Sequence, residues 1–273
     1  MELTITKEDF AKIIGTPSTQ INNLFAKVQP YFVNVQAALE HEICYLIADF
    51  PANNQIIADE TERFVCLMAY FVAIPSIDLV WTDTGFGVVQ NNTLAPASRD
   101  RVNALRDSIR EQAIATKYHL LDELYKIQAF ADAQPKTGFV FLYSQYQQLD
   151  GNQLTAVEFD EKVGAFRDGE RKLRMLISRA EMERLCGFAR HAFVPAFVIS
   201  DAQKAAIRLI SQFCIEHERD FCAATLYLPE ILQIINDEAN AAEFPLYRES
   251  DECKANNAEH YENTADKPTF FFC

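Results

Sequence analysis

Three residues with metal-binding side chains lie close together in the sequence: Cys214, His217 and Cys222. Thiolates and imidazoles are the ligands that zinc prefers. On a helix, Cys214 and His217 lie one turn apart and could contact one ion, but Cys222 falls on a different turn and no second ligand pair is near. His217 also continues an apolar stripe. We therefore expect a core histidine and no metal, and an enzyme with a cryptic Cys214/His217 site is the alternative.

A second group with acid–base chemistry is Glu40-His41-Glu42, close to Cys44. Carboxylates and an imidazole at this spacing could transfer protons, but the group falls on the polar side of its segment. We interpret it as a solvated helix face. None of the eight glycines precedes a lysine, and HExxH and GxSxG are absent, so no phosphate loop, zincin or serine hydrolase motif is present. The sequence predicts no catalytic residue, no cofactor and no enzyme.

Helical periodicity is the main structural signal. Ser98 is the expected N-cap of a helix of about 30 residues that ends near Asp132 to Lys136, where Pro135 lies. Glycine is scarce, at 8 of 273 residues, and this favours helices because glycine weakens them. Further helices are expected over 19–48 with a break at Pro30, over about 57–73, from about 155, after Ser200, and from Pro229 to about Ala242.

One apolar spacing occurs twice. Phe25, Phe32, Leu39 and Ile43 have the same intervals as Phe159, Phe166, Leu173 and Ile177. An internal repeat is one interpretation, and chance similarity between two amphipathic segments is the other.

Two segments are typical of extended structure. IDLVWTDTGFGVVQNN predicts a small β-hairpin or an extended excursion at about 77–95, and GFVFLYSQYQQL predicts a second strand. The expected fold is mainly α: a helical bundle with two lobes, the excursion and short peripheral strands. Its expected parts are an N-terminal lobe (1–134), a β-containing connection (135–150), a C-terminal lobe (151–247) and an acidic tail ending in an aromatic segment (248–273).

The charge excludes some partners. The formal net charge is −14, which opposes binding to nucleic acid or anionic lipid. The start of the chain has no signal-peptide pattern and no segment is long and apolar enough to span a membrane, so we expect an intracellular protein. The scattered cysteines argue against a disulfide framework. Lys162 to Arg190 is a mildly cationic stretch, either a solvated face or a docking surface for an acidic partner.

The order of three segments carries a resemblance. Over about residues 5–130, the chain resembles an uncharacterised family encoded in tailed phages and prophages of gut bacteria. The segments that carry the resemblance are, in order, FAKVQPYFVNVQAALEHEI, IDLVWTDTGFGVVQNN and TLAPASRDRVNAL. FPLYRES and KPTFFF near the end match more loosely. The organisation, a helix bundle with an extended excursion and a C-terminal tail, looks like head-to-tail connector adaptors, also called head completion proteins.

The resemblance implies a structural virion protein without enzymatic activity. It would form a ring of copies of itself between the portal protein and tail-side connector proteins, in the host cytoplasm during assembly and then in the virion. An exposed extended segment can add a strand to a neighbouring sheet, so the expected interface residues are Trp81, Phe86, Val88, Val89, Phe270, Phe271 and Phe272. The alternative is an intracellular protein-binding module with no virion role.

Overall fold

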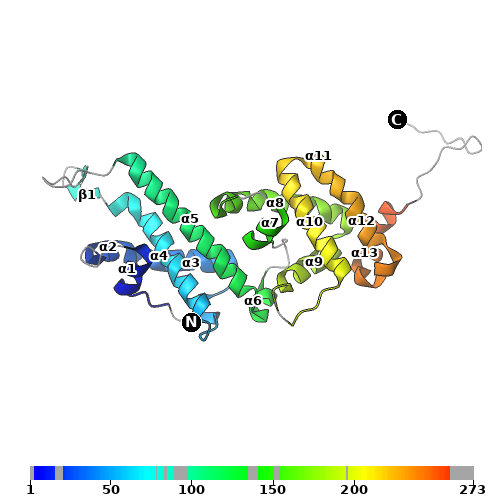
Figure 1. Ribbon diagram of the computed structural model, residues 1–273, viewed down its shortest axis with the longest axis horizontal. Helices are drawn as coiled ribbons and strands as arrows, with labels where there is room; N and C mark the ends of the chain where they lie inside the picture. Colours follow the sequence, from blue (N-terminus) through cyan, green and yellow to red (C-terminus); the bar gives the residue numbers. More distant parts are fainter. Residues whose placement is uncertain are drawn as a thin grey trace, which may run out of the picture.

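The structure of the protein is a computed structural model. The structure describes residues 3–15, 21–77, 79–82, 85–88, 98–134, 141–150, 154–194 and 196–258. The fold is mainly α, as predicted, and the helices form two lobes arranged along the long axis of the molecule (Figure 1).

The first lobe is built around two long helices that pack side by side, α4 (Gln55–Ile77) and α5 (Arg99–Leu124). Three shorter helices cover α4: α1 (Lys7–Ile14), α2 (Ile21–Val28) and α3 (Phe32–Ile43). A 3-10 turn at Gln29–Tyr31 separates α2 from α3, so the predicted break at Pro30 is confirmed. The lobe ends with α6 (Gln128–Ala133).

The second lobe is centred on the packing of α8 (Ala156–Ile177) against α10 (Asp201–Arg219). Its other helices are α7 (Tyr143–Asp150), α9 (Arg179–His191), α11 (Phe221–Ala224), α12 (Leu228–Asn236), α13 (Pro245–Arg248) and α14 (Asp251–Asn256). Short 3-10 turns lie at Ile47–Asp49, Thr225–Tyr227 and Glu238–Glu243. Ser98, Thr155 and Ser200 cap α5, α8 and α10 through their side chains, as their sequence context indicates.

The described strands are β1 (Leu79–Thr82) and β2 (Gly85–Val88), which pair antiparallel between α4 and α5. They lie at the end of the α4–α5 pair that is farthest from the second lobe (Figure 1). Among the described residues, no helix is both long and apolar enough to cross a membrane.

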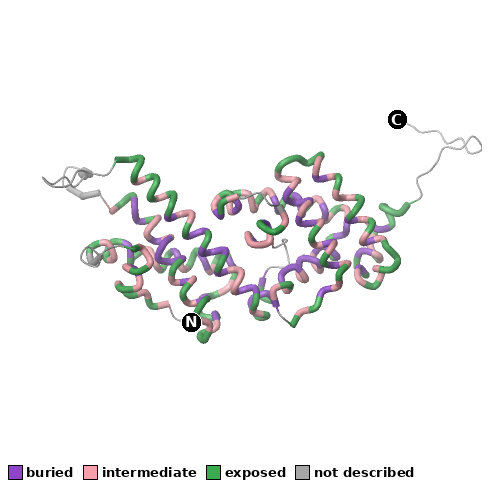
Figure 2. The backbone as a smooth tube through the Cα atoms, viewed as in Figure 1, coloured by how far each residue is buried: buried purple, intermediate pink, exposed green. Residues whose placement is uncertain are grey.

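Helix α5 belongs to both hydrophobic cores. Ile109, Leu120 and Leu124 lie in the core of the first lobe, whereas Ile114 and Tyr118 lie in that of the second. The buried positions follow the insides of both lobes (Figure 2). Because one rigid helix contributes to two cores, the position of each lobe depends on the other.

The long helix ends earlier than predicted. It stops at Leu124, and Ile127 has an extended backbone before α6 begins. The last turn tightens, since Ile127 N–H donates to Leu124 O at 2.9 Å, a 3-10 bond. Tyr125 is buried and packs edge-on against Phe130 with ring centroids 5.0 Å apart. Apolar periodicity continues through this turn between α5 and α6, so it could not predict that the packing of Tyr125 against Phe130 ends the helix.

The second predicted strand, over 138–149, is wrong where the structure describes it. Residues Tyr143–Asp150 form α7, and Tyr146 is fully buried in the second core. Leu142 N–H donates to Gln145 Oε1 at 3.0 Å at the start of the helix. Aromatic residues favour strands only weakly, and burial against α8 and α10 overrides that preference. Residues 135–140 lie outside the described part.

The tail expected from residue 248 is helical in its described part. Residues after 248 form α14, with Ser250 as N-cap, and Cys253 is buried in the second core. Asn256 Nδ2 donates to Leu176 O at 2.8 Å, which ties α14 to the end of α8. The acidic residues Asp251 and Glu252 lie in the first turn of this helix, where they suit the helix dipole.

The two sets of residues with the same spacing are arranged differently. Phe25 lies on α2, whereas Phe32, Leu39 and Ile43 lie on α3 beyond the 3-10 turn. Phe159, Phe166, Leu173 and Ile177 all lie on the single helix α8 and are buried.

Candidate functional site at the strand pair and the lobe joint

The β1–β2 pair contains three of the residues expected at an interface. Trp81 is the register partner of Phe86, and Leu79 is that of Val88. Residues two apart in a strand occupy the same face, so these four positions share one face of the pair. Among the described residues the sheet has two strands, so each strand has one edge without a neighbouring strand. Val89 and Phe270 to Phe272 lie outside the described residues.

The helices beneath the strand pair are held by specific contacts. Lys27 Nζ donates to the Ile77 carbonyl at the C-terminal end of α4, where a cation is favourable because of the helix dipole. The Arg106 guanidinium of α5 lies 4.7 Å from the centre of the Phe71 ring of α4. These contacts fix the end of α4 from which β1 begins.

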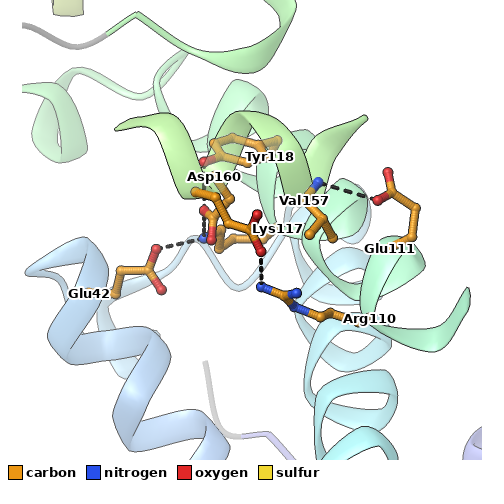
Figure 3. Close-up of polar contacts among 8 residues, drawn as sticks. Glu42, Arg110, Glu111, Lys117, Tyr118, Val157 and Asp160 are labelled. Atoms are coloured by element: carbon orange, nitrogen blue, oxygen red, sulfur yellow. Dashed lines mark hydrogen bonds and ion pairs between the residues drawn. The ribbon is translucent and has the colours of Figure 1, made fainter. Parts of the chain in front are cut away.

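The joint between the lobes centres on one buried cation. Lys117 on α5 is 3% exposed, and its ammonium lies 2.7 Å from Glu42 Oε1 of α3 and 2.6 Å from Asp160 Oδ1 of α8 (Figure 3). Tyr118 Oη donates to the same Asp160 oxygen at 2.7 Å. Burial, together with the Asp160 carboxylate, raises the pKa of Tyr118 well above its usual range. The phenol therefore stays protonated and remains a hydrogen-bond donor.

A second set of contacts extends this joint along α5. Glu111 accepts hydrogen bonds from Ala156 N at 2.8 Å and from Val157 N at 3.3 Å, at the start of α8. Figure 3 shows the contact with Val157. A carboxylate at a helix N-terminus satisfies free N–H groups and complements the dipole. Arg110 pairs with Glu161 at 2.8 Å, on the exposed side of the same contact. Helix α5 thus places the Glu111 carboxylate at the N-terminus of α8. It also places two cations, Arg110 and Lys117, against carboxylates of α8.

The joint is a connected network of charged and polar side chains. The Lys117 ammonium and the Tyr118 hydroxyl both donate to the Asp160 carboxylate. Buried polar networks of this kind fix one arrangement of the elements that they connect. The joint therefore orients the second lobe relative to α5 and the strand pair.

Sequence reasoning missed Lys117 and Asp160, although one signal was present. Lys117 follows Ala113 by four residues and precedes Leu120 by three, so it falls on the apolar stripe of its helix. A lysine at such a position must find a buried anion or be excluded from the core.

The Cys214–His217–Cys222 group does not form a site. Cys214 is buried and Cys222 is exposed, and no cluster of three potential metal ligands occurs among the described residues. His217 lies between the rings of Phe213 and Phe221. Burial, and then the nearby Lys172, lower its pKa. This environment favours the neutral imidazole.

The interpretation of Glu40-His41-Glu42 as a solvated face is confirmed for His41 and Glu42, which are exposed, and is wrong for Glu40, which is half-buried. Glu40 Oε1 accepts from Ile47 N at 3.0 Å, at the 3-10 turn after α3, and Glu42 pairs with buried Lys117. His41 is exposed. The partners of both carboxylates lie beyond α3, so helix periodicity alone could not place them.

The cationic stretch from Lys162 to Arg190 is largely neutralised within the second lobe. Its ion pairs join Lys162 to Glu218, Arg171 to Asp168, Arg174 to Glu170, Arg179 to Glu183, and Arg184 to Glu181. Lys172 stacks on the Phe221 ring at 4.1 Å and Arg190 is 4% exposed. Five of the eight cations in this stretch therefore have a carboxylate partner within the lobe.

Residues 35–137 match a family described as a family of unknown function (DUF6712). The matched part runs from α3 to the end of the first lobe and includes the strand pair and α5. No curated protein and no solved structure matches the chain.

Proposed function

We propose that the protein is a structural virion component of the head-to-tail connector adaptor kind, and that the β1–β2 pair is its contact with neighbouring subunits. The observation that carries the proposal is the placement of this pair at the end of two long packed helices, with both outer strand edges open among the described residues. A two-stranded pair is marginally stable on its own, and strand addition by a neighbour would satisfy its free backbone groups.

The helical body suits a load-bearing role. At about 1.5 Å per residue, a helix of 26 residues such as α5 spans roughly 39 Å. It carries the strand pair at one end and the lobe joint towards the other. A rigid helix of this length can hold two neighbouring subunits at a fixed separation, and this role needs no catalytic residue. The sequence resemblance over about residues 5–130 supports the same role, and the aromatic segment Phe270 to Phe272 is proposed as a second contact.

The test of the proposed function is the protein content of purified particles. Particles from an induced culture of the host should contain this protein in near-equal copy number to the portal protein, measured by quantitative mass spectrometry. Complete particles that lack the protein would overturn the virion role and leave the intracellular binding module as the working hypothesis.

Charge placed on one face of the strand pair should block assembly. The double variant Phe86→Lys/Val88→Lys is expected to reduce incorporation into particles at least about tenfold, because lysine on an assembling strand face or edge opposes pairing. The matched control is Thr82→Lys, which the register places on the opposite face. Circular dichroism should show both proteins folded. Normal incorporation of the double variant would exclude this face as the contact.

A further inference from the structure

We propose that His191 and Asp132 form a proton-dependent latch between the two lobes, which is closed when the imidazole is doubly protonated and released as pH rises. The inference is independent of the virion role. It rests on the hydrogen-bond geometry of one histidine, on its place between the lobes and on the contrast with the Lys117 joint.

The two ring nitrogens of His191 both face acceptors. Nε2 lies 2.8 Å from Asp132 Oδ1, and Nδ1 lies 2.6 Å from the Gly187 carbonyl oxygen. A neutral imidazole has one N–H, so it can satisfy only one of these acceptors, whereas imidazolium donates to both. Asp132 is the ionised partner, since the hydrogen bond from His191 lowers its pKa. The arrangement is therefore complete only with the extra proton.

The pair connects elements of different lobes. Asp132 lies on α6 of the first lobe, and His191 lies in the last turn of α9 of the second lobe. Helix α6 packs against α9 (Figure 1). The C-terminal end of α9 favours a cation because of the helix dipole. The His191 ring also lies 4.9 Å from the Phe197 ring, which restricts its orientation.

The surroundings of the latch contain few competing charges. A cleft of about 490 Å³ lies beside it, between α6, α9, the segment after α9 and α13. The charged groups lining this cleft, besides the pair itself, are Glu183, Arg184 and Arg190, all on α9. Arg184 is engaged by Glu181 and by the Glu243 carbonyl, and Glu183 by Arg179. The segment 192–199 has no titratable side chain, and α13 contributes Leu246. Asp132 is therefore the anion that directly bonds the ring.

Release of the latch would leave other contacts between the lobes intact, among them the Lys117 network and the packing of Val194 and Phe193 against the core of the first lobe. The Lys117 network pairs an ammonium with carboxylates, groups that ordinarily keep their charges between pH 5 and pH 8, whereas histidine titrates within that range. Loss of the proton removes the charge and one of the two hydrogen bonds of His191. The cleft edge formed by α6 and α9 then loosens, while α5 stays fixed to α8.

The titration of His191 tests the electrostatic part of the proposal. Measured by NMR on the full chain, wild type should hold the His191 proton about threefold to tenfold more tightly than Asp132→Asn, because an adjacent anion favours the charged imidazole and solvent screens part of that effect. Asp132 is 59% exposed, so the substitution should leave the fold intact. Asp168→Asn, which removes a similarly exposed partner of Arg171 within α8, is the matched control and should leave the titration unchanged. Equal titration in wild type and Asp132→Asn would overturn the proposal.

The distance between the lobes tests the mechanical part. Spin labels on α6 and α9 report the separation that the latch controls, so they are attached to the exposed positions Ala129→Cys and Ala180→Cys. The background replaces the exposed Cys44 and Cys222, and Cys273, by serine, and the other described cysteines are buried. The distance distribution of wild type should shift or broaden between about pH 5.5 and pH 8. Asp132→Asn should show the high-pH distribution throughout. An identical wild-type distribution at both ends of this range would exclude a latch.

Discussion

Replacing Lys117 by methionine is expected to lower the free energy of unfolding by about 2–4 kcal/mol, which is a large fraction of the stability of a typical domain. The Lys117 ammonium pairs with two facing carboxylates, those of Glu42 and Asp160. Among the described residues, it is the one group that both carboxylates contact. Without it, the Glu42 and Asp160 carboxylates, which are 55% and 29% exposed, remain close together and lose the cation that they share. Glu42 is 55% exposed and can be rehydrated, so we place the cost below that of a fully buried unpaired charge.

The matched control is Arg110→Met on the same helix. Arg110 also joins α5 to α8, but its pair with Glu161 is exposed on both sides, at 38% and 57%. Exposed pairs contribute about 0–1 kcal/mol. Urea unfolding followed by circular dichroism would give both values. Equal losses for the two variants would show that burial of the ammonium has no special effect.

A triple variant separates the loss of packing from the loss of charge balance. Adding Glu42→Gln and Asp160→Asn to Lys117→Met removes the uncompensated anions, and amides need no cation nearby. Removing both sides of a buried interaction is less costly than removing one. We expect more than half of the lost stability to return. No recovery would mean that the lysine stem, rather than its charge, supports the joint.

The sequence was most informative where the signal is local. The cap at Ser98 and the break at Pro30 are determined by residues within one helical turn, and both are present in the structure. The segment Tyr143–Asp150 was misassigned because its aromatic residues favour strands, whereas its conformation is decided by burial of Tyr146. Tertiary packing overrides a weak intrinsic preference.

The joint between the lobes could not be read from one sequence. Lys117 is separated from Glu42 by 75 residues and from Asp160 by 43. Its position on an apolar stripe indicates that it needs a buried anion, but the stripe does not say which of the 39 acidic residues provides it. The same reason hid the pairing of Asp132 with His191, which are 59 residues apart. Each pair forms only after distant helices pack.

The packing of α8 against α10 should be the second sensitive point, at Gly169. A Cβ at this position would lie 3.1 Å from the Cα of Cys214 and 3.2 Å from the Cβ of His217. The first of these neighbours is backbone, so the helices must separate to accept a side chain. Gly169→Val is expected to lower the free energy of unfolding by about 2–3 kcal/mol, since overpacking of a core costs roughly this amount and a β-branched side chain has little freedom to avoid the clash.

Gly164→Val on the same helix is the control that isolates this effect. A Cβ at Gly164 meets nothing within 4 Å, and valine is a slightly better helix former than glycine, by a few tenths of a kcal/mol. Urea unfolding should therefore show Gly164→Val at or slightly above wild type and Gly169→Val clearly below it. Because both substitutions add the same side chain to the same helix, their difference measures the α8–α10 contact alone. Equal stability of the two variants would mean that the helices can move apart freely, and the second lobe would then be too compliant to act as part of a rigid connector.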